Sequence, residues 1–119
     1  MAGTADDFLK LIEAIRTGGA PILSEEVVAE ALRNQIGDLP RPGSAAIGRR
    51  FGLLGAVLDD PVAARSPQAR GTQNWGGVYG HNWFFDPANG LSVVSMSNTA
   101  PEGSNGPYRE EVRDAVYGA

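Results

Sequence analysis

One stretch limits the folds open to this chain more than any other: two apolar runs joined by five residues that favour a turn. The first run is Trp83-Phe84-Phe85, whose aromatic side chains suit a half-buried pleated surface. The second run, residues 91–96, is rich in β-branched and apolar side chains. Between them, residues 86–90 contain a proline, which presets φ, and an Asn-Gly pair that tolerates positive φ. The sequence therefore predicts a β-hairpin here.

Another apolar run precedes this hairpin. Residues 51–58 are apolar on both faces of an extended chain, which predicts one internal strand that is covered on each side. Gly52 and Gly55 within the run predict close packing of a helix over it. The adjacent Asp59 and Asp60 stand at the end of the run before a proline, a context that favours a turn over a metal site.

Helical patterns stand on both sides of the predicted strands. Apolar residues recur at i, i+3, i+4 and i+7 after Thr4, which can cap a helix together with Asp7 in a capping box. A second, short helix is expected from Ser24 to about Asn34, with glutamates in its first turn. A third is expected at Pro107, because proline is favoured at the first position of a helix.

Together these elements predict an α+β fold. We expect an antiparallel β-sheet of three or four strands, with N-terminal helices and a C-terminal helix packed on it. The expected organisation is a helical segment over residues 1–35, a linker rich in glycine and proline over residues 36–46, and the sheet with the last helix over residues 47–119. The 119 residues and their ordinary globular composition fit a single domain.

Composition excludes several classes of chemistry. The chain has no cysteine, which excludes disulfides, thiolate catalysis and cysteine metal sites, and one histidine cannot form a multi-histidine site. The formal net charge of -4 argues against nucleic acid or an anionic membrane as a partner. No long apolar run and no signal-peptide pattern are visible. We therefore expect no metal, no cofactor and a cytoplasmic location, or a periplasmic one if a signal lies upstream of Met1.

The box Trp75-Gly76-Gly77, followed by Gly80, the aromatic run and the hairpin, resembles the C-terminal part of the serine β-lactamase and penicillin-binding-protein superfamily. The match is to class C-like members, such as family VIII carboxylesterases and D,D-peptidases. There a Lys-Thr-Gly or His-Thr-Gly box lies on the strand beside the active site, and in many of the esterases it is Trp-Gly-Gly. The resemblance covers residues 2 to about 117 and implies the C-terminal portion of a larger hydrolase domain, with a partial β-lactamase/transpeptidase-like fold.

The same resemblance implies roles for the box residues. Trp75 takes the place of the box lysine or histidine and is expected to line the acyl pocket. Gly76 and Gly77 are expected to bind substrate by leaving space for it, and the backbone N–H of Val78 is expected to be one of two oxyanion-hole donors. Read without the family, two adjacent glycines in a strand indicate either a bulge or bend, or the close approach of a ligand or of another backbone.

The chain departs from the superfamily in the nucleophile. Acyl transfer there uses a Ser-x-x-Lys motif, which places both side chains on one helix face so that the amine can take the serine proton. Lys10 is the only lysine, no serine precedes it by three residues, and no Tyr-x-Asn box is present. A triad built on His81 would need Asp86 and a serine. The candidates, Ser95 and Ser97, lie in no Gly-x-Ser-x-Gly elbow, which favours a hairpin-end role for the histidine.

Two functions remain open at this stage. The first is a C-terminal fragment of a serine β-lactamase-like or esterase-like hydrolase. It would supply the box strand and an oxyanion-hole N–H, lack the nucleophile, and be inactive alone. It would take a small acyl substrate, either an ester, a β-lactam or an amide, only when completed by an N-terminal half. The second is a non-enzymatic α+β binding module, or a homo-oligomer that covers exposed sheet surface.

Overall fold

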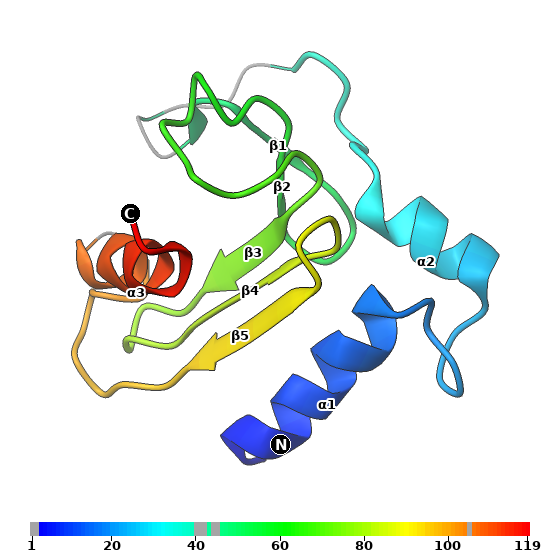
Figure 1. Ribbon diagram of the computed structural model, residues 1–119, viewed down its shortest axis with the longest axis horizontal. Helices are drawn as coiled ribbons and strands as arrows, with labels where there is room; N and C mark the ends of the chain where they lie inside the picture. Colours follow the sequence, from blue (N-terminus) through cyan, green and yellow to red (C-terminus); the bar gives the residue numbers. More distant parts are fainter. Residues whose placement is uncertain (1–2, 40–42, 44–45, 105) are drawn as a thin grey trace.

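The computed structural model describes residues 3–39, 43, 46–104 and 106–119 (Figure 1). The helices are α1 (Ala5–Arg16), α2 (Glu25–Leu32) and α3 (Tyr108–Tyr117). The strands are β1 (Arg49–Phe51), β2 (Ala56–Leu58), β3 (Gln73–Gly76), β4 (Asn82–Asp86) and β5 (Leu91–Ser95). Residues 40–42, 44 and 45 of the predicted linker over residues 36–46 lie outside the described residues.

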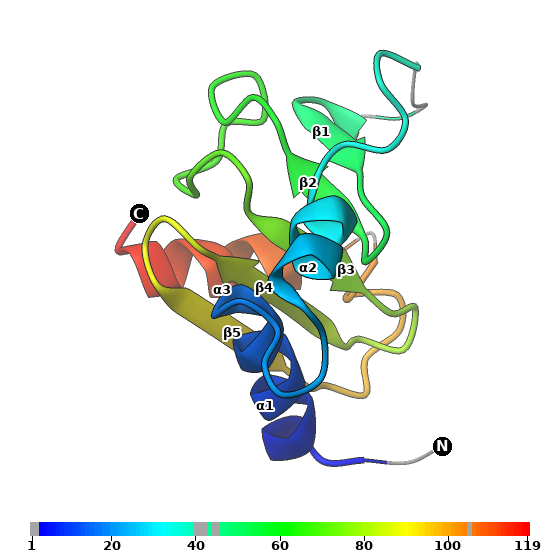
Figure 2. The ribbon, with the colours of Figure 1, turned by 90° about the vertical axis from the view of Figure 1, so that its right-hand side faces the viewer.

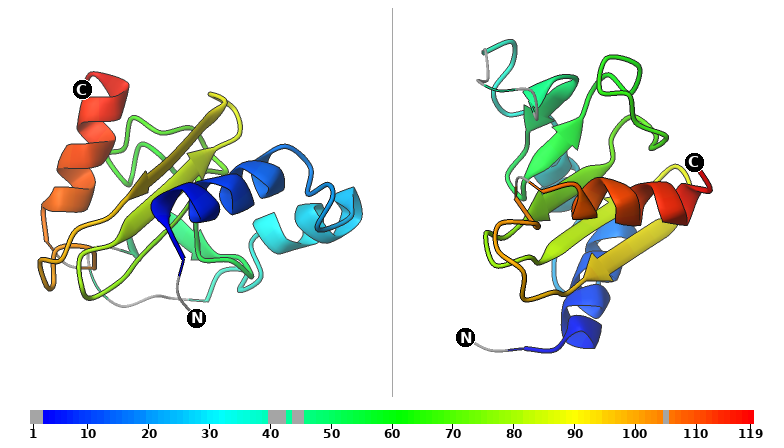
Figure 3. Two further views of the ribbon diagram at one scale, coloured as in Figure 1. Left: turned by 90° about the horizontal axis from the view of Figure 1, so that it is seen from below. Right: turned by 90° about the vertical axis from the view of Figure 1, so that its left-hand side faces the viewer.

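The five strands form one antiparallel sheet in the order β1-β2-β3-β4-β5. Helices α1 and α3 lie on opposite sides of its β3–β5 part, as the view from below shows (Figure 3). The predicted α+β class, with helices packed on an antiparallel sheet, is confirmed. The helices that the structure describes are all too short and too polar to cross a membrane.

The sheet has five strands instead of three or four because residues 51–58 form a hairpin, so the single internal strand predicted there is wrong. Phe51 pairs with Ala56, and the N–H of Gly52 donates to the Gly55 carbonyl across the turn. Helix α2 lies beside this hairpin (Figure 2). A Cβ on Gly52 would stand 2.7 Å from the carbonyl oxygen of Ala31 in α2, so the predicted close packing of a helix is found at this glycine. At Gly55 the close neighbour is strand β3.

The aromatic residues of β4 cover both faces of the sheet, as the period of two along a strand requires. Phe84 faces α3, where its ring lies 6.2 Å from that of Tyr117. Trp83 faces α1 and meets the edge of Phe8 at 5.8 Å. Phe85 is fully buried on the α1 side, and full burial of such a side chain stabilises the fold by roughly 1.5–3 kcal/mol. The core cluster on that side consists of Phe85, Ile12, Ile15 and Val28.

The predicted helix starts are confirmed. The side chain of Thr4 accepts from the backbone N–H of Asp7, and the Asp7 carboxylate reaches back to the Thr4 N–H, which completes the capping box. Ser24 caps α2, which ends at Leu32, two residues before the expected end. Pro107 directly precedes the first residue of α3 and already has a helical φ of -69°.

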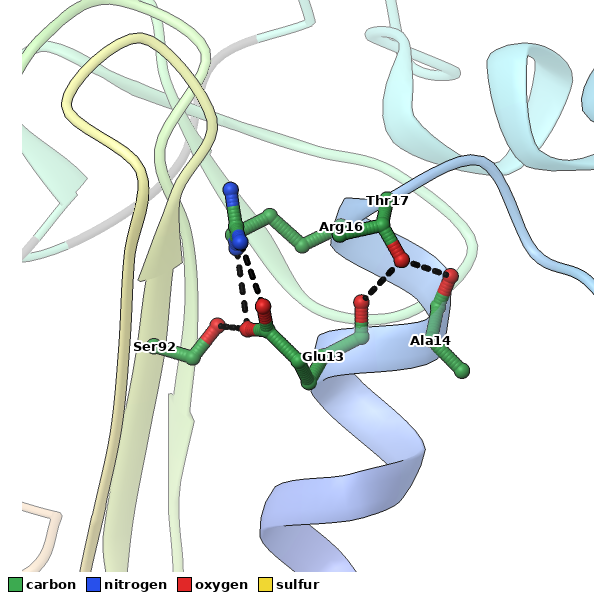
Figure 4. A network of polar contacts seen from close by, with 5 residues as sticks. All are labelled: Glu13, Ala14, Arg16, Thr17 and Ser92. Carbon is green, nitrogen blue, oxygen red and sulfur yellow. Dashed lines mark hydrogen bonds and ion pairs between the residues drawn. The ribbon is translucent and has the colours of Figure 1, made fainter.

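A polar network joins α1 to the edge strand β5 (Figure 4). Glu13 accepts a hydrogen bond from Arg16 Nε at 2.9 Å and one from Ser92 Oγ at 2.6 Å. A second guanidinium nitrogen of Arg16 pairs with the other carboxylate oxygen. The hydrogen bonds from Arg16 and then from Ser92 lower the pKa of Glu13 to about 2. The network therefore needs the ionised carboxylate.

We expect Glu13→Gln to lower the free energy of unfolding by about 0.5–1 kcal/mol at pH 7. The value is small because the Glu13 side chain is 44% exposed, so solvent screens the ion pair. Since the folded pKa is depressed, this contribution is present above the unfolded pKa and is lost as the pH falls towards the folded value of about 2. Urea unfolding at pH 7 and at pH 2 measures it. An equal difference from wild type at both pH values would contradict the assignment.

Candidate functional site

The box Trp75-Gly76-Gly77 lies where β3 ends and turns towards β4. Strand β3 is paired on both sides at its start, but its pairing with β2 ends at Asn74. Its pairing with β4 continues to Gly76, which lies opposite Asn82. The end of β3 therefore has a neighbouring strand on one side only. Backbone groups on the other side of this segment are free of the sheet ladder.

A broad cavity of about 420 Å³ opens beside the box. It lies on the α1 side of the sheet, because its walls include Phe8 of α1 together with Trp75 and Trp83. The indole of Trp75 is 46% exposed and leans on the ring of Phe51, with ring centroids 5.2 Å apart. Such a mostly apolar hollow with a few polar groups is typical of small-molecule sites. Gly76, Gly77, His81 and Met96 complete the part of the wall nearest the box.

The two box glycines have different surroundings. A Cβ on Gly76 would lie 1.8 Å from the carbonyl oxygen of Gly103, so the backbone of the loop before α3 already fills the room expected there. A Cβ on Gly77 would meet nothing nearer than the His81 side chain, at 4.0 Å. Of the alternatives that the sequence left open, the approach of another backbone applies to Gly76. Open space beside the cavity is found only at Gly77.

The backbone N–H of Val78 is available as a donor. The turn around it is closed by two hydrogen bonds, from Gly77 N–H to the His81 carbonyl at 2.8 Å and from Gly80 N–H to the Gly77 carbonyl at 3.0 Å. Within the part of the chain that the structure describes, the Val78 N–H has no such partner. Val78 itself is 53% exposed. An unpaired N–H on an exposed residue next to the box is an arrangement that suits an oxyanion donor.

The alternative triad is not assembled. His81 immediately precedes β4 and Asp86 ends it, so five residues of extended chain separate them by about 17 Å. Asp86 is fully buried and bonded elsewhere. Ser97 Oγ donates to the Gly80 carbonyl at 3.2 Å, and Ser95 bonds to the hydroxyl of Tyr108 in α3. His81 is thus a turn residue at the end of a hairpin, as favoured from the sequence.

The aspartate pair is also accounted for by the backbone. Asp60 accepts from the N–H of Ala63 at 2.9 Å in a turn, and Asp59 pairs with Arg70 at 2.6 Å. The predicted turn is confirmed. Among the described residues, no cluster of three or more His, Asp or Glu side chains could hold a metal ion.

Sequence reasoning missed two contributors to the site. Gly103 fills the space over Gly76, and its own surroundings are so tight that a Cβ there would lie 2.4 Å from the carbonyl oxygens of Gly77 and His81. Phe8 begins the apolar stripe of α1, yet it also forms cavity wall. The only sequence signal for Gly103 is a glycine in a loop. The place of Phe8 in the cavity wall depends on how α1 lies across the sheet.

The chain resembles known esterases over nearly its whole length. A family model described as Beta-lactamase matches residues 1–117. Esterase EstB from Burkholderia gladioli is 50% identical over 117 residues, which are 98% of this chain and 29% of EstB. The solved structure of EstCE1, a hydrolase with promiscuous acyltransferase activity, matches with a TM-score of 0.84 at 46% identity, over 97% of this chain and 30% of that one.

A more distant structure shares the fold alone. The unliganded simvastatin synthase LovD from Aspergillus terreus matches with a TM-score of 0.70 at 19% identity, over 92% of this chain and 32% of that one. The chain thus spans less than a third of the length of each of these proteins. The match of the family model to residues 1–117 and the 50% identity to EstB lead to one conclusion: the chain belongs to the β-lactamase family.

Proposed function

We propose that this chain forms one wall of an acyl-transfer site that acts on esters, and that the nucleophile comes from sequence outside these 119 residues. The observation that carries the proposal is the Val78 N–H, which has no hydrogen-bond partner among the described residues and directly follows the three box residues that line the cavity. Attack on an ester carbonyl places negative charge on its oxygen. Preorganised N–H groups stabilise that charge, and loss of one such donor costs about 100-fold to 1000-fold in rate.

Trp75 is the proposed contact for the acyl group. Its indole stands half-exposed at the cavity, and Phe8 and Trp83 extend the same apolar wall. An ester with an apolar acyl group fits these surroundings better than a charged substrate. The name of EstB as an esterase and the description of EstCE1 as a hydrolase with acyltransferase activity support the same class of reaction. Gly77 is proposed to keep the cavity open beside His81.

The proposal predicts that the chain is inactive alone and active when completed. The 119 residues contain no Ser-x-x-Lys motif, so purified chain is expected to leave p-nitrophenyl butyrate unhydrolysed above background. Co-expression with the part of EstB outside the matched region is expected to give hydrolysis. That part is proposed to supply the nucleophile, and the 50% identity between this chain and EstB favours association of the two parts. Initial rates of nitrophenolate release measure both results.

Two controls separate the outcomes. The EstB part alone is expected to be inactive, and so is the complex in which the serine of any Ser-x-x-Lys motif in that part is changed to alanine. Turnover by the isolated chain, with a stoichiometric fluorophosphonate adduct, would contradict the missing nucleophile.

The second candidate, self-association, is favoured by the position of β5 as the last strand of the sheet, with an edge open to another copy. Concentration-dependent sedimentation without any complementation would support it over the first.

A further inference from the structure

A second cavity, of about 270 Å³, lies on the face of the sheet opposite the proposed acyl site. Its walls come from strands β1 to β4, from the loop before α3 and from α3 itself. Phe84 contributes from β4, and its ring also contacts Tyr117, which fixes this face as the α3 side. Trp75, Gly76 and Asn82 line both cavities, and the proposed function makes no use of the arginines on this side.

The cavity gathers arginine side chains in an acidic protein. Three arginines contribute to its wall: Arg49 from β1, and Arg109 and Arg113 from α3. The chain as a whole has a formal net charge of -4, with only ten lysine and arginine residues. Glu110 is the one carboxylate on the same wall, and it is exposed. A concentration of guanidinium groups against the overall charge of the protein creates a local positive potential.

Three polar side chains of the wall, those of Asn82, Arg109 and Arg113, keep unused donors among the described residues. Asn82 is only 7% exposed, yet its side chain makes no hydrogen bond to another described residue. Arg113 is 9% exposed and uses Nε to pair with Asp114 at 2.6 Å, which leaves its two terminal nitrogens for the cavity. Arg109 forms no ion pair with a described residue. These donors line the cavity and can therefore pair with an acceptor that enters it.

We propose that this cavity binds a carboxylate or phosphate group. The planar fork of a guanidinium matches the two oxygens of such a group, and charge-assisted hydrogen bonds of this kind are the strong ones. The amide of Asn82 adds a further donor at the inner wall. The volume fits a small molecule of about the size of citrate. The same chemistry is also offered by an acidic side chain from the remainder of a longer protein, and the experiment below distinguishes these two sources.

The test is titration calorimetry of the whole 119-residue chain with citrate and with inorganic phosphate at low ionic strength. Wild type is expected to bind at least one of them with saturation. Arg109→Gln is expected to weaken that binding by about 10-fold to 100-fold, because one charge-assisted hydrogen bond is lost. Arg65→Gln is the matched control. Arg65 is exposed and does not line the cavity, so the same change of charge there is expected to leave affinity unaltered.

A second variant guards against loss of folding. Asn82→Asp keeps the shape of the side chain and places a carboxylate against the arginines, so it is expected to abolish citrate and phosphate binding in a folded protein, as checked by circular dichroism.

The complex of this chain with the EstB part then distinguishes a free anion from an acidic side chain of the longer protein. Citrate binding that persists in the complex identifies a free anion. Binding that is lost there, with assembly weakened by Arg109→Gln and unaffected by Arg65→Gln, identifies an acidic side chain. No anion binding together with unaltered assembly of Arg109→Gln overturns the proposal.

Discussion

Replacing Asp86 with alanine is expected to lower the free energy of unfolding by about 3–5 kcal/mol. The carboxylate is fully buried and accepts hydrogen bonds from the Ala69 N–H at 3.0 Å and the Tyr117 hydroxyl at 2.6 Å. It also accepts from the backbone and side-chain nitrogens of Asn89 in the hairpin turn, at 3.1 and 2.8 Å. Alanine leaves the Ala69 N–H and the Tyr117 hydroxyl, both on partly buried residues, without this acceptor, and each buried donor left unpaired costs about 1–3 kcal/mol.

Such a loss is large for a chain of this size, because domains are stable by only about 5–15 kcal/mol. Asp86 joins the loop before β3, the β4–β5 turn and the end of α3, so three distant segments loosen together when it is removed. Urea unfolding followed by circular dichroism measures the effect. Asp6→Ala is the control, since Asp6 is exposed in the first turn of α1 and is expected to cost below about 1 kcal/mol. Equal losses at both aspartates would contradict the network.

The pH dependence of the Asp86 effect follows from its ionisation. Burial raises the pKa of Asp86, but the hydrogen bonds from Tyr117, Asn89 and the Ala69 N–H outweigh burial and hold the pKa below its usual value. Because the folded pKa is depressed, the stabilisation is complete above the unfolded pKa of about 3.9 and is lost as the pH falls through the folded value. The difference in stability between wild type and Asp86→Asn is therefore expected to shrink below about pH 4.

The hairpin around Asp86 shows what local sequence can predict. A turn with Asp, Pro, Asn and Gly between two β-forming runs has one well-populated geometry, so residues 86–90 fold as expected, with Gly90 at a φ of +66°. The run over residues 51–58 has no such turn residue other than its glycines. The turn between β1 and β2 is stabilised by residues distant in the sequence, including a hydrogen bond from the Leu53 N–H to the Ala31 carbonyl at 3.0 Å. No local pattern encodes an acceptor that is 22 residues away.

The candidate site shows the same division. The sequence placed Trp75, Gly77 and Val78 together, because they are consecutive or nearly so in one strand and turn. It gave no means to separate Gly76 from Gly77, since the reason for the first glycine is the backbone of Gly103, at the far end of another loop. The basic cavity was likewise invisible, because its arginines are distributed over β1 and α3 and become neighbours only when the sheet and the helix pack.

The two box glycines give the second large prediction, as a matched pair. Gly76→Ala is expected to lower the free energy of unfolding by about 1–3 kcal/mol or more, because its Cβ would lie 1.8 Å from the Gly103 oxygen. That oxygen cannot retreat cheaply, since Gly103 is itself packed against the turn that contains His81. Gly77→Ala adds the same methyl group one residue later in open space, and Gly77 has no positive φ that an alanine would strain. Its stability is expected to stay within about 1 kcal/mol of wild type.

Activity then separates packing from substrate binding at the box. In the complex completed by the EstB part, the methyl group of Gly77→Ala projects towards the cavity beside His81. It is therefore expected to lower kcat/KM for p-nitrophenyl butyrate by about 10-fold or more while the complex stays assembled, because misplacement of the ester by about 1 Å costs on the order of 100-fold. The activity of Gly76→Ala is expected to fall only in proportion to the fraction of the variant chain that does not assemble with the EstB part. A fully active Gly77→Ala complex would remove the box from the substrate site and leave both glycines with a role in chain packing alone.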